Sequence, residues 1–379
     1  MSAIAGLDLN GAWDWAALNG GTAADGTPLE PRLNGGGING SVIRLYDDDQ
    51  LVGGPQAELA PHGRGPGWGR IGDRAYRAQV RDILENVVQP DAANRDEAVK
   101  QLHALVDAIA GDANTLVAAI PDHPGFGEAN RQALLDALRA RQRGSVSLLW
   151  RPIATLLGWI ASLPASQEEG VGLREQMHVC VVSLMPDGVR VAEARLRSHA
   201  GRKGWIWVPE RRQPGILLTS GFAGSELVQH KAHALARQVE QNVQEVFDVM
   251  TAPWRSAMDQ PGGETVIRLK NRSWRRLEPL GVATDFGDLP TPDAQALAHI
   301  ETAEHIVVDG PFAANAAWRK HVLQALGLDD SYERVHVAAP ETAAIGCREA
   351  GERMSAGEPP YYDFLPQLEI NALKDNEEQ

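Results

Sequence analysis

Short apolar runs that end in turns alternate along the first half of the chain with segments of helical periodicity. Residues 3–9 predict an apolar strand ending at an Asn-Gly turn, and residues 12–18 predict its return strand. Apolar side chains at three- and four-residue spacing predict the helices, one of which has Pro152 in its first turn. Helices are predicted at 75–88, 94–109, 128–141 and 153–163, and further strands at 41–46, 51–52, 116–120 and 147–150.

The second half repeats this alternation. The run 179–182, the turn Met185-Pro186-Asp187-Gly188 and the run 189–192 predict a hairpin. Ser225 is the expected cap of a long helix that reaches residue 250. We further predict that 205–208 pairs with 216–219, a strand at 305–308, helices at 314–326 and 341–354, and a disordered acidic tail at 374–379. Hairpins followed by helices, twice over, predict a mixed α/β fold with two related lobes.

Composition and charge limit the function classes. The chain has 379 residues, 43% hydrophobic and 23% charged, which is typical of compact globular proteins. Its net charge of −14 argues against nucleic acid as a partner. The most apolar stretch, 152–163, is too short to cross a bilayer, and the N-terminus lacks a basic leader, so we expect a cytoplasmic protein with no membrane partner. Cys180 and Cys347 are too few for a disulfide framework and are interpreted as core thiols, so no disulfide is expected.

Five stretches stand out by their order and spacing, namely 3–18, 116–137, 148–158, 179–194, and 306–326 with 340–351. Together they resemble the nucleotide-binding domain of the seventy-kilodalton heat-shock chaperones of the DnaK type, within the superfamily of actins, sugar kinases and those chaperones. The resemblance implies an actin-like ATPase fold, in which two lobes, each with a mixed sheet flanked by helices, surround a central cleft. It implies lobe I at 1–165, lobe II at 166–373, and ATP or ADP with Mg²⁺ as the cofactor.

Two regions depart from that family. Residues 195–300 contain an insertion-like hairpin with Trp205 and Trp207 and a reduced second-lobe head at about 226–300. The chain also stops near the point where the peptide-binding domain of the chaperones would begin, so client binding in the chaperone manner is not implied.

The resemblance places two phosphate loops, and both are altered. Asp8 stands at the position of the family's catalytic aspartate, but the small hydroxyl residues after it are replaced by Asn10, Gly11 and a Trp. In the second loop, Ser183 replaces a carboxylate, and Pro186 removes a backbone N–H that could approach phosphate. The candidate phosphate-contacting residues are Asn10, Gly11, Ser183, Asp187 and Gly188.

The remaining candidate residues each have two interpretations. Arg151 stands where the family has its water-orienting Glu, and it either contacts phosphate or a partner's carboxylate, or forms a salt bridge between the lobes. Asp8 is either a ligand or a structural remnant, and Asp187 either a relocated metal ligand or part of an ordinary Pro-Asp-Gly turn. Gly310 and Gly346 are implied to frame an adenosine pocket, with Asp309 in place of the family's first Gly.

These changes favour a pseudo-ATPase that serves as a regulatory or protein-interaction module, with a protein partner held by Trp- and Arg-rich segments. The alternative is an ATP-binding protein with weak ATPase activity that uses Asp8. A second alternative is a small-molecule kinase of the sugar-kinase type, suggested by the stretch 308–312. Should the chain be an enzyme, ATP hydrolysis is the activity that we expect.

Overall fold

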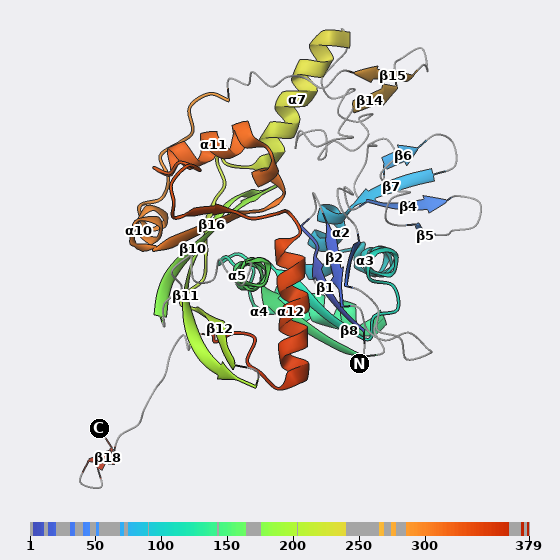
Figure 1. Cartoon of the computed structure of the whole chain (residues 1–379). Helices are drawn as coiled ribbons and strands as arrows, with labels where there is room; N and C mark the ends of the chain where they lie inside the picture. Colours follow the sequence, from blue (N-terminus) through green and yellow to red (C-terminus); the bar gives the residue numbers. More distant parts are fainter. Residues whose placement is uncertain are drawn as a thin grey trace.

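The structure is a computed structural model, and the statements below concern only the residues that it describes. These are 3–10, 14–19, 31–34, 41–45, 51–52, 69–71, 75–89, 91–141, 144–163, 176–202, 204–239, 265–268, 274–277, 286–363, 373–374 and 377–378. They form two mixed sheets with helices between them and on their outer faces (Figure 1).

The first sheet has the strand order β3-β2-β1-β8-β9. β2 lies antiparallel between β1 and β3, whereas β8 and β9 run parallel to β1. β1 and β8 are buried along most of their length, as their continuous apolar sequences predict for strands covered on both faces. The strands are β1 (Ile4–Asp8), β2 (Trp15–Leu18), β3 (Arg32–Asn34), β8 (Thr115–Ile120) and β9 (Ser145–Trp150).

The second sheet repeats that order as β12-β11-β10-β16-β17, with β13 as an additional strand on β11. β10 and β11 are antiparallel, β12 continues antiparallel on β11, and β16 and β17 run parallel to β10. Each sheet therefore consists of an antiparallel meander of three strands followed by two parallel strands. The strands are β10 (Gln176–Met185), β11 (Gly188–Gly201), β12 (Gly204–Arg211), β13 (Ile216–Leu218), β16 (His305–Asp309) and β17 (Val335–Val337).

Two helices, α5 (Arg151–Ser162) and α12 (Thr342–Ala356), lie between the sheets (Figure 1). α5 is apolar on nearly all sides and buried from Arg151 to Ile160, as expected for a central helix. The two helices cross closely because a glycine of each faces the backbone of the other. A Cβ on Gly346 would lie 1.7 Å from the Ala154 carbonyl oxygen, and one on Gly158 would lie 1.9 Å from that of Thr342. Both sheets share one apolar core around this crossing.

Further helices cover the outer face of each sheet. α2 (Val80–Val88), α3 (Arg95–Ala110) and α4 (Glu128–Arg141) form a core with the first sheet. α7 (Gly224–Val239), α10 (Ala294–Thr302), the 3₁₀ helix η1 (Pro311–Ala314) and α11 (Ala316–Ala325) form a core with the second. Asp293 and Asn315 accept hydrogen bonds from backbone N–H groups in the first turns of α10 and α11, which fixes where these helices begin.

Residues 75–79 were wrongly predicted as helix. They form β7 (Ala75–Gln79), which pairs with β4 (Ser41–Leu45) and β6 (Gly69–Ile71), and the helix begins only at Val80. Two partner strands supply hydrogen bonds that outweigh the local helical spacing. β5 (Leu51–Val52) completes this sheet, and the smaller pairs are β14 (Thr265–Arg268) with β15 (Trp274–Leu277) and β18 (Leu373–Lys374) with β19 (Glu377–Glu378). In the last pair, Lys374 and both residues of β19 fall within the segment 374–379, for which we expected disorder.

The predicted pairing of 205–208 with 216–219 is also wrong, because β12 and β13 both pair with β11. Their registers on β11 do not overlap: β12 pairs with residues 194–201 of β11 and β13 with residues 189–191. Trp205 and Trp207 lie on β12, which is the third strand of the antiparallel meander in the second sheet and has β3 as its counterpart in the first.

Two sequence expectations concern the cysteines and the membrane. Cys180 and Cys347 are free and buried, as predicted. Burial raises the pKa of the Cys180 thiol to about 12 and that of Cys347 well above its ordinary value, so both are unreactive core thiols. Within the described ranges, no helix is both long and apolar enough to span a membrane.

Candidate functional site

The buried centre of the molecule is a guanidinium group between carboxylates of the two sheets. Arg151 directly follows β9 and opens α5, and Asp8 is the last residue of β1 in the same sheet. From the second sheet, Ser183 lies near the end of β10 and Asp309 ends β16. All four residues thus lie at or near the carboxyl ends of strands, three of them central strands and one, before Arg151, the edge strand β9. Binding sites of α/β sheets usually lie at these strand ends.

Arg151 makes hydrogen bonds with residues of both sheets. Its Nε and Nη2 atoms donate to Asp8 Oδ1 and Oδ2 at 3.1 and 3.0 Å, a bidentate pair. Its Nη1 atom donates to Asp309 Oδ2 at 2.8 Å and to Ser183 Oγ at 3.3 Å. The side chains of Arg151, Asp8 and Asp309 are only 5%, 1% and 1% exposed. The predicted salt bridge between the two halves is therefore confirmed for Arg151.

Two hydroxyl groups complete the hydrogen bonding of Asp309. Ser183 Oγ donates to Asp309 Oδ1, and Thr155 Oγ1, one turn along α5, donates to Asp309 Oδ2, both at 2.5 Å. Asp8 receives a further hydrogen bond from Asn10 Nδ2 at 3.1 Å. Each carboxylate oxygen of this centre thus has a donor, which is the condition for burying two carboxylates at acceptable cost.

The electrostatics keep Arg151 charged. Burial disfavours the cationic form, but the carboxylates of Asp309 and Asp8 and their hydrogen bonds outweigh burial and raise the pKa of Arg151 above its ordinary value. A guanidinium with this pKa has no proton to exchange near neutral pH and cannot act as a general base. The centre is thus a fixed cation held by two anions.

A second buried ion pair also joins the two sheets. Arg211 at the end of β12 donates through Nε and Nη2 to Asp122, which follows β8, at 3.0 and 2.7 Å. Its Nη1 donates to Asp363 at 3.1 Å, and its guanidinium lies 4.1 Å from the ring centroid of Trp150. Burial lowers the pKa of Arg211, but the Asp122 hydrogen bond and charge, with Asp363, raise it by more. Two cations therefore tie the halves of the molecule together.

The structure brings together three of the residues predicted from the sequence, Asp8, Arg151 and Ser183, with Asn10 beside them. Asp187 and Gly188 lie at the turn between β10 and β11, where Asp187 pairs with Arg190 at 2.7 Å rather than with this centre. Gly11 lies outside the described residues.

The two predicted adenosine-pocket glycines both lie in close contact with backbone of other elements. Gly310 has a φ of +96°, which favours glycine, and a Cβ there would meet the Leu184 carbonyl oxygen at 2.4 Å. Gly346 belongs to the crossing of α5 and α12. Both glycines permit close backbone packing, and their role toward adenosine stays a prediction.

Sequence reasoning missed two members of the centre, Asp309 and Thr155. Asp309 was recognised only as a replacement in the family's loop, although a carboxylate at the end of an apolar strand needs a partner. Thr155 was treated as part of an apolar helix. Its position four residues after Arg151 places both side chains on one face of α5, and this spacing was the available signal.

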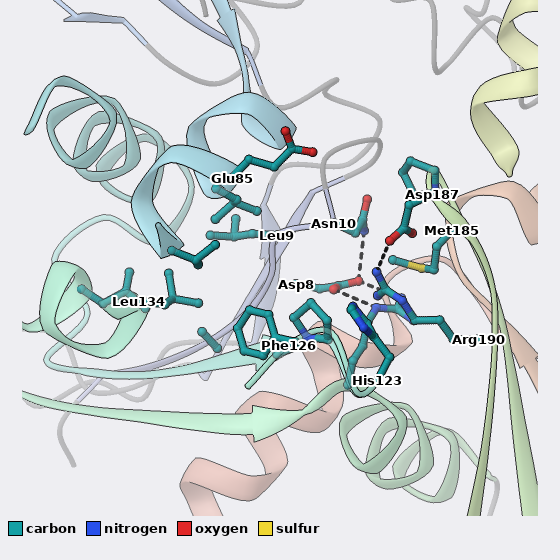
Figure 2. Close-up of a pocket in the computed structure, with 18 residues that line it drawn as sticks. Asp8, Leu9, Asn10, Glu85, His123, Phe126, Leu134, Met185, Asp187 and Arg190 are labelled. Atoms are coloured by element: carbon teal, nitrogen blue, oxygen red, sulfur yellow. Dashed lines mark hydrogen bonds and ion pairs between the residues drawn. The ribbon is translucent and has the colours of Figure 1, made fainter. Parts of the chain in front are cut away.

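A pocket of about 210 Å³ opens beside the guanidinium, between the first sheet, its outer helices and the β10–β11 turn of the second sheet (Figure 2). We call it the α2–α4 pocket. Its apolar wall consists of Leu9, Leu84, Val88, Phe126, Leu134 and Leu138. Its polar rim consists of Asp8, Asn10, Glu85, His123, Asp187 and Arg190, with Arg151 behind Asp8.

No known protein-family model matches the chain, and no curated protein is recognisably similar to it in sequence.

Proposed function

We propose that this chain is a chaperone-like member of the actin-like ATPase fold that no longer hydrolyses nucleotide and that acts as a regulatory or protein-interaction module. The strand order, repeated in both sheets with two helices between them, supports the fold. The position of Arg151 supports the loss of catalysis.

The observation that carries the proposal is the guanidinium between Asp8 and Asp309. Hydrolysis in this fold would need Mg²⁺ held by carboxylates and water next to the phosphates. Both oxygens of Asp8 are bonded to Arg151, so a metal ion at Asp8 would have to displace the guanidinium and leave it buried with Asp309 as its remaining carboxylate partner. These residues therefore fit Mg²⁺ poorly. Within the described part of the chain, moreover, no group of three His, Cys, Asp or Glu residues could hold a metal ion.

The turn of the second hairpin supports the same conclusion. Pro186 has no backbone N–H to offer a phosphate, and Met185 before it is a bulky residue where a phosphate loop needs small ones. The weak-ATPase alternative requires Asp8 to be released from Arg151. The stretch that suggested a sugar kinase forms the end of β16 and η1, and its carboxylate, Asp309, is engaged by Arg151.

Nucleotide titration tests the catalytic part of the proposal. We expect millimolar ATP or ADP with Mg²⁺ to leave the melting temperature unchanged, because a ligand that binds the folded state must raise it through mass action. We also expect no phosphate release above that of a buffer blank. Hydrolysis that Asp8→Asn abolishes, and that the control Asp112→Asn leaves intact, would establish the weak ATPase instead.

The interaction part of the proposal rests on Trp205, whose side chain is 76% exposed on β12, an edge strand of the second sheet. Large exposed aromatic residues are typical anchors of protein interfaces. We expect Trp205→Ala to keep the melting temperature and to lose a stoichiometric partner that the unchanged protein captures from its source cells. The matched control is Tyr332→Ala, at a side chain that is 50% exposed on another surface. Identical captured proteins for Trp205→Ala and the unchanged chain would contradict the proposal.

A further inference from the structure

The chain that leaves α12 turns back and lies beside the outer edge of β12. We call residues 358–363 the C-terminal segment. Gly357 ends α12 in the left-handed conformation, with a φ of +72°, and Pro359 and Pro360 cannot continue the helix and favour extended backbone. β12 is an edge strand of the second sheet. An extended segment is therefore presented to a sheet edge, which is able to bond it.

The C-terminal segment bonds to β12 in the way of an added parallel strand. Tyr362 N–H donates to the Pro209 carbonyl oxygen at 2.9 Å, and Arg211 N–H donates to the Tyr362 carbonyl oxygen at 2.8 Å. The two bonds lie on either side of Glu210 and make a parallel bridge. Addition of a strand to a sheet edge is a general way to hold an extended peptide: main-chain bonds give affinity, and side-chain contacts give specificity.

The carboxylate of Asp363 receives one donor from each sheet. Trp150 Nε1, at the end of β9, donates to Asp363 Oδ2 at 3.1 Å, and Arg211 Nη1 donates to Oδ1 at 3.1 Å. Both donors are fixed independently of Asp363, because Asp122 holds the other side of the guanidinium, which lies 4.1 Å from the Trp150 ring centroid. The indole and the guanidinium thus form a preorganised site for a carboxylate.

The two tyrosines before Asp363 add aromatic contacts. Tyr361 is partly buried and packs against the core that the two sheets share. The hydroxyl group of Tyr362 lies 3.0 Å from His199 Nδ1, on the neighbouring strand β11. The site therefore accepts two aromatic residues followed by an acidic one, in an extended chain that runs parallel to β12.

The C-terminal segment is held less firmly than the strands beneath it. One isolated bridge joins its described residues to β12, whereas β11 pairs with all eight residues of β12. The Asp363 side chain is 39% exposed, and Tyr362 is 37% exposed. Segments with few buried contacts open at low free energy. A tethered segment competes at an effective concentration of about 1 mM, so a partner segment with the same contacts and a few more can replace it.

We propose that the β12 edge, with Arg211 and Trp150, is the docking site for an extended segment of a partner protein that carries two aromatic residues followed by an acidic one. The chain's own C-terminal segment occupies this site until the partner replaces it, which makes the contact autoinhibitory. The proposal rests on the interaction function proposed above and specifies the chemistry of the partner.

The test uses two heptapeptides with the sequence of residues 357–363, one ending in Asp and one in Asn. Both are labelled with fluorescein, amidated at the C-terminus and titrated into the full chain by fluorescence anisotropy. We expect the unchanged chain to bind the Asp peptide only at about 1 mM, because its own segment competes. Asp363→Asn removes the carboxylate from that segment, so we expect it to bind the Asp peptide at least about tenfold more tightly.

The control for this variant is Asp91→Asn, at an exposed carboxylate between α2 and α3, which should bind the Asp peptide as the unchanged chain does. Folding of both variants is checked by circular dichroism. No binding of the Asp peptide to folded Asp363→Asn at 1 mM would overturn the proposal. Equal binding of the Asp and Asn peptides would overturn it as well.

A further substitution in the Asp363→Asn chain locates the carboxylate contact. Trp150→Phe keeps an aromatic ring beside Arg211 but removes the indole N–H. We expect the preference for the Asp peptide over the Asn peptide to fall by at least about fivefold. Trp205→Phe, on β12, is the matched control and should keep the preference. An unchanged preference in folded Trp150→Phe would overturn the assignment.

The peptide experiment needs no natural partner, so its outcome is separate from that of the capture experiment with Trp205→Ala. Binding of the Asp peptide supports the docking site whatever that experiment returns. A captured partner without peptide binding would overturn the docking site and leave the interaction function standing.

Discussion

At the scale of single residues, Arg151 is the buried cation on which carboxylates of both sheets depend. The guanidinium compensates two carboxylates that are only 1% exposed and that come from different sheets. The net contribution of the intact group to stability can be small, because the three ions also lost their hydration. Removal of the cation alone should lower the stability strongly, because it leaves the like charges of Asp8 and Asp309 buried near each other.

We predict that Arg151→Met lowers the free energy of unfolding by about 3–5 kcal/mol, measured by urea denaturation. The control is Arg212→Met, at a side chain that is 40% exposed and paired with Glu210, where the loss should stay below about 1 kcal/mol. The triple variant Asp8→Asn, Arg151→Met, Asp309→Asn should recover part of the loss. An Arg151→Met protein as stable as the unchanged chain would contradict the role of this ion pair.

The candidate site was only partly predictable from the sequence. The resemblance indicated Asp8, Ser183 and Arg151 as one site, and the structure brings them together. The acceptor Asp309 lies 158 residues from Arg151 in sequence, and no local pattern reports which cation a buried carboxylate meets across such a distance.

A histidine pair gives stability a dependence on pH. His305 Nδ1 and His336 Nε2 lie 2.9 Å apart, an arrangement that needs one ring to donate and the other to accept. Burial, and then the neighbouring His305, lower the pKa of His336. The unfolded chain, whose histidines titrate near 6.5, therefore takes up the proton first as the pH falls.

We predict that stability is fully present above about pH 6.5 and decreases below it. The slope due to this pair is at most about 0.5 kcal/mol per pH unit, because the half-exposed ring is screened by solvent. His336→Gln should flatten the dependence in urea unfolding between pH 7.5 and 5.5. Equal slopes for the variant and the unchanged protein would assign the acid sensitivity to other groups.

At the scale of elements, the crossing of α5 and α12 fixes how closely the two sheets approach. Gly158 and Gly346 face carbonyl groups of the opposite helix, so their lack of a side chain sets the distance between the helix axes. Intrinsic propensity favours Ala over Gly within a helix by about 1 kcal/mol. Packing thus predicts that a Gly-to-Ala substitution at this crossing lowers the stability, whereas helix propensity predicts that it raises the stability.

We predict that packing outweighs propensity, and that Gly346→Ala lowers the free energy of unfolding by at least about 1–3 kcal/mol. The new methyl group would lie within 1.7 Å of the Ala154 carbonyl oxygen, which is main chain and cannot rotate away. Ser355→Ala, near the end of the same helix, is the matched control with little expected change. A stabilised Gly346→Ala protein would show that the helices separate at no cost.

Elements with strong local patterns were predicted well. α4 has the bounds predicted from its apolar spacing, and the Pro186–Asp187 turn of the β10–β11 hairpin follows from its residue types. The failures lie where a partner strand decides the outcome. β7 forms because β4 and β6 flank it, and β12 pairs with β11 rather than with β13.

At the scale of the whole molecule, the sequence indicated two related lobes of mixed sheets flanked by helices, and the structure confirms two mixed sheets with helices. The repeated strand order could not be derived from sequence, because the members of each sheet are separated by long stretches of chain: β1 pairs with β8, and β10 with β16. Because of the repetition, Asp8 and Asp309 each end a parallel central strand, one in each sheet. One arginine between the sheets therefore reaches both carboxylates.

The two halves should unfold as one unit, because they share the core around α5 and α12 and are joined by Arg151 and Arg211. We predict coincident urea transitions by far-ultraviolet circular dichroism and tryptophan fluorescence. Arg211→Met leaves Asp122 buried without its bidentate partner. We expect this variant to lower the free energy of unfolding by about 3–5 kcal/mol, so that both transitions move together to lower urea concentration. Two resolved transitions, in either protein, would mean that the halves are independent and that the ion pairs only align them. A single transition that moves as a whole would instead make the link between the halves part of the fold, as expected when buried cations and a shared core join the two sheets.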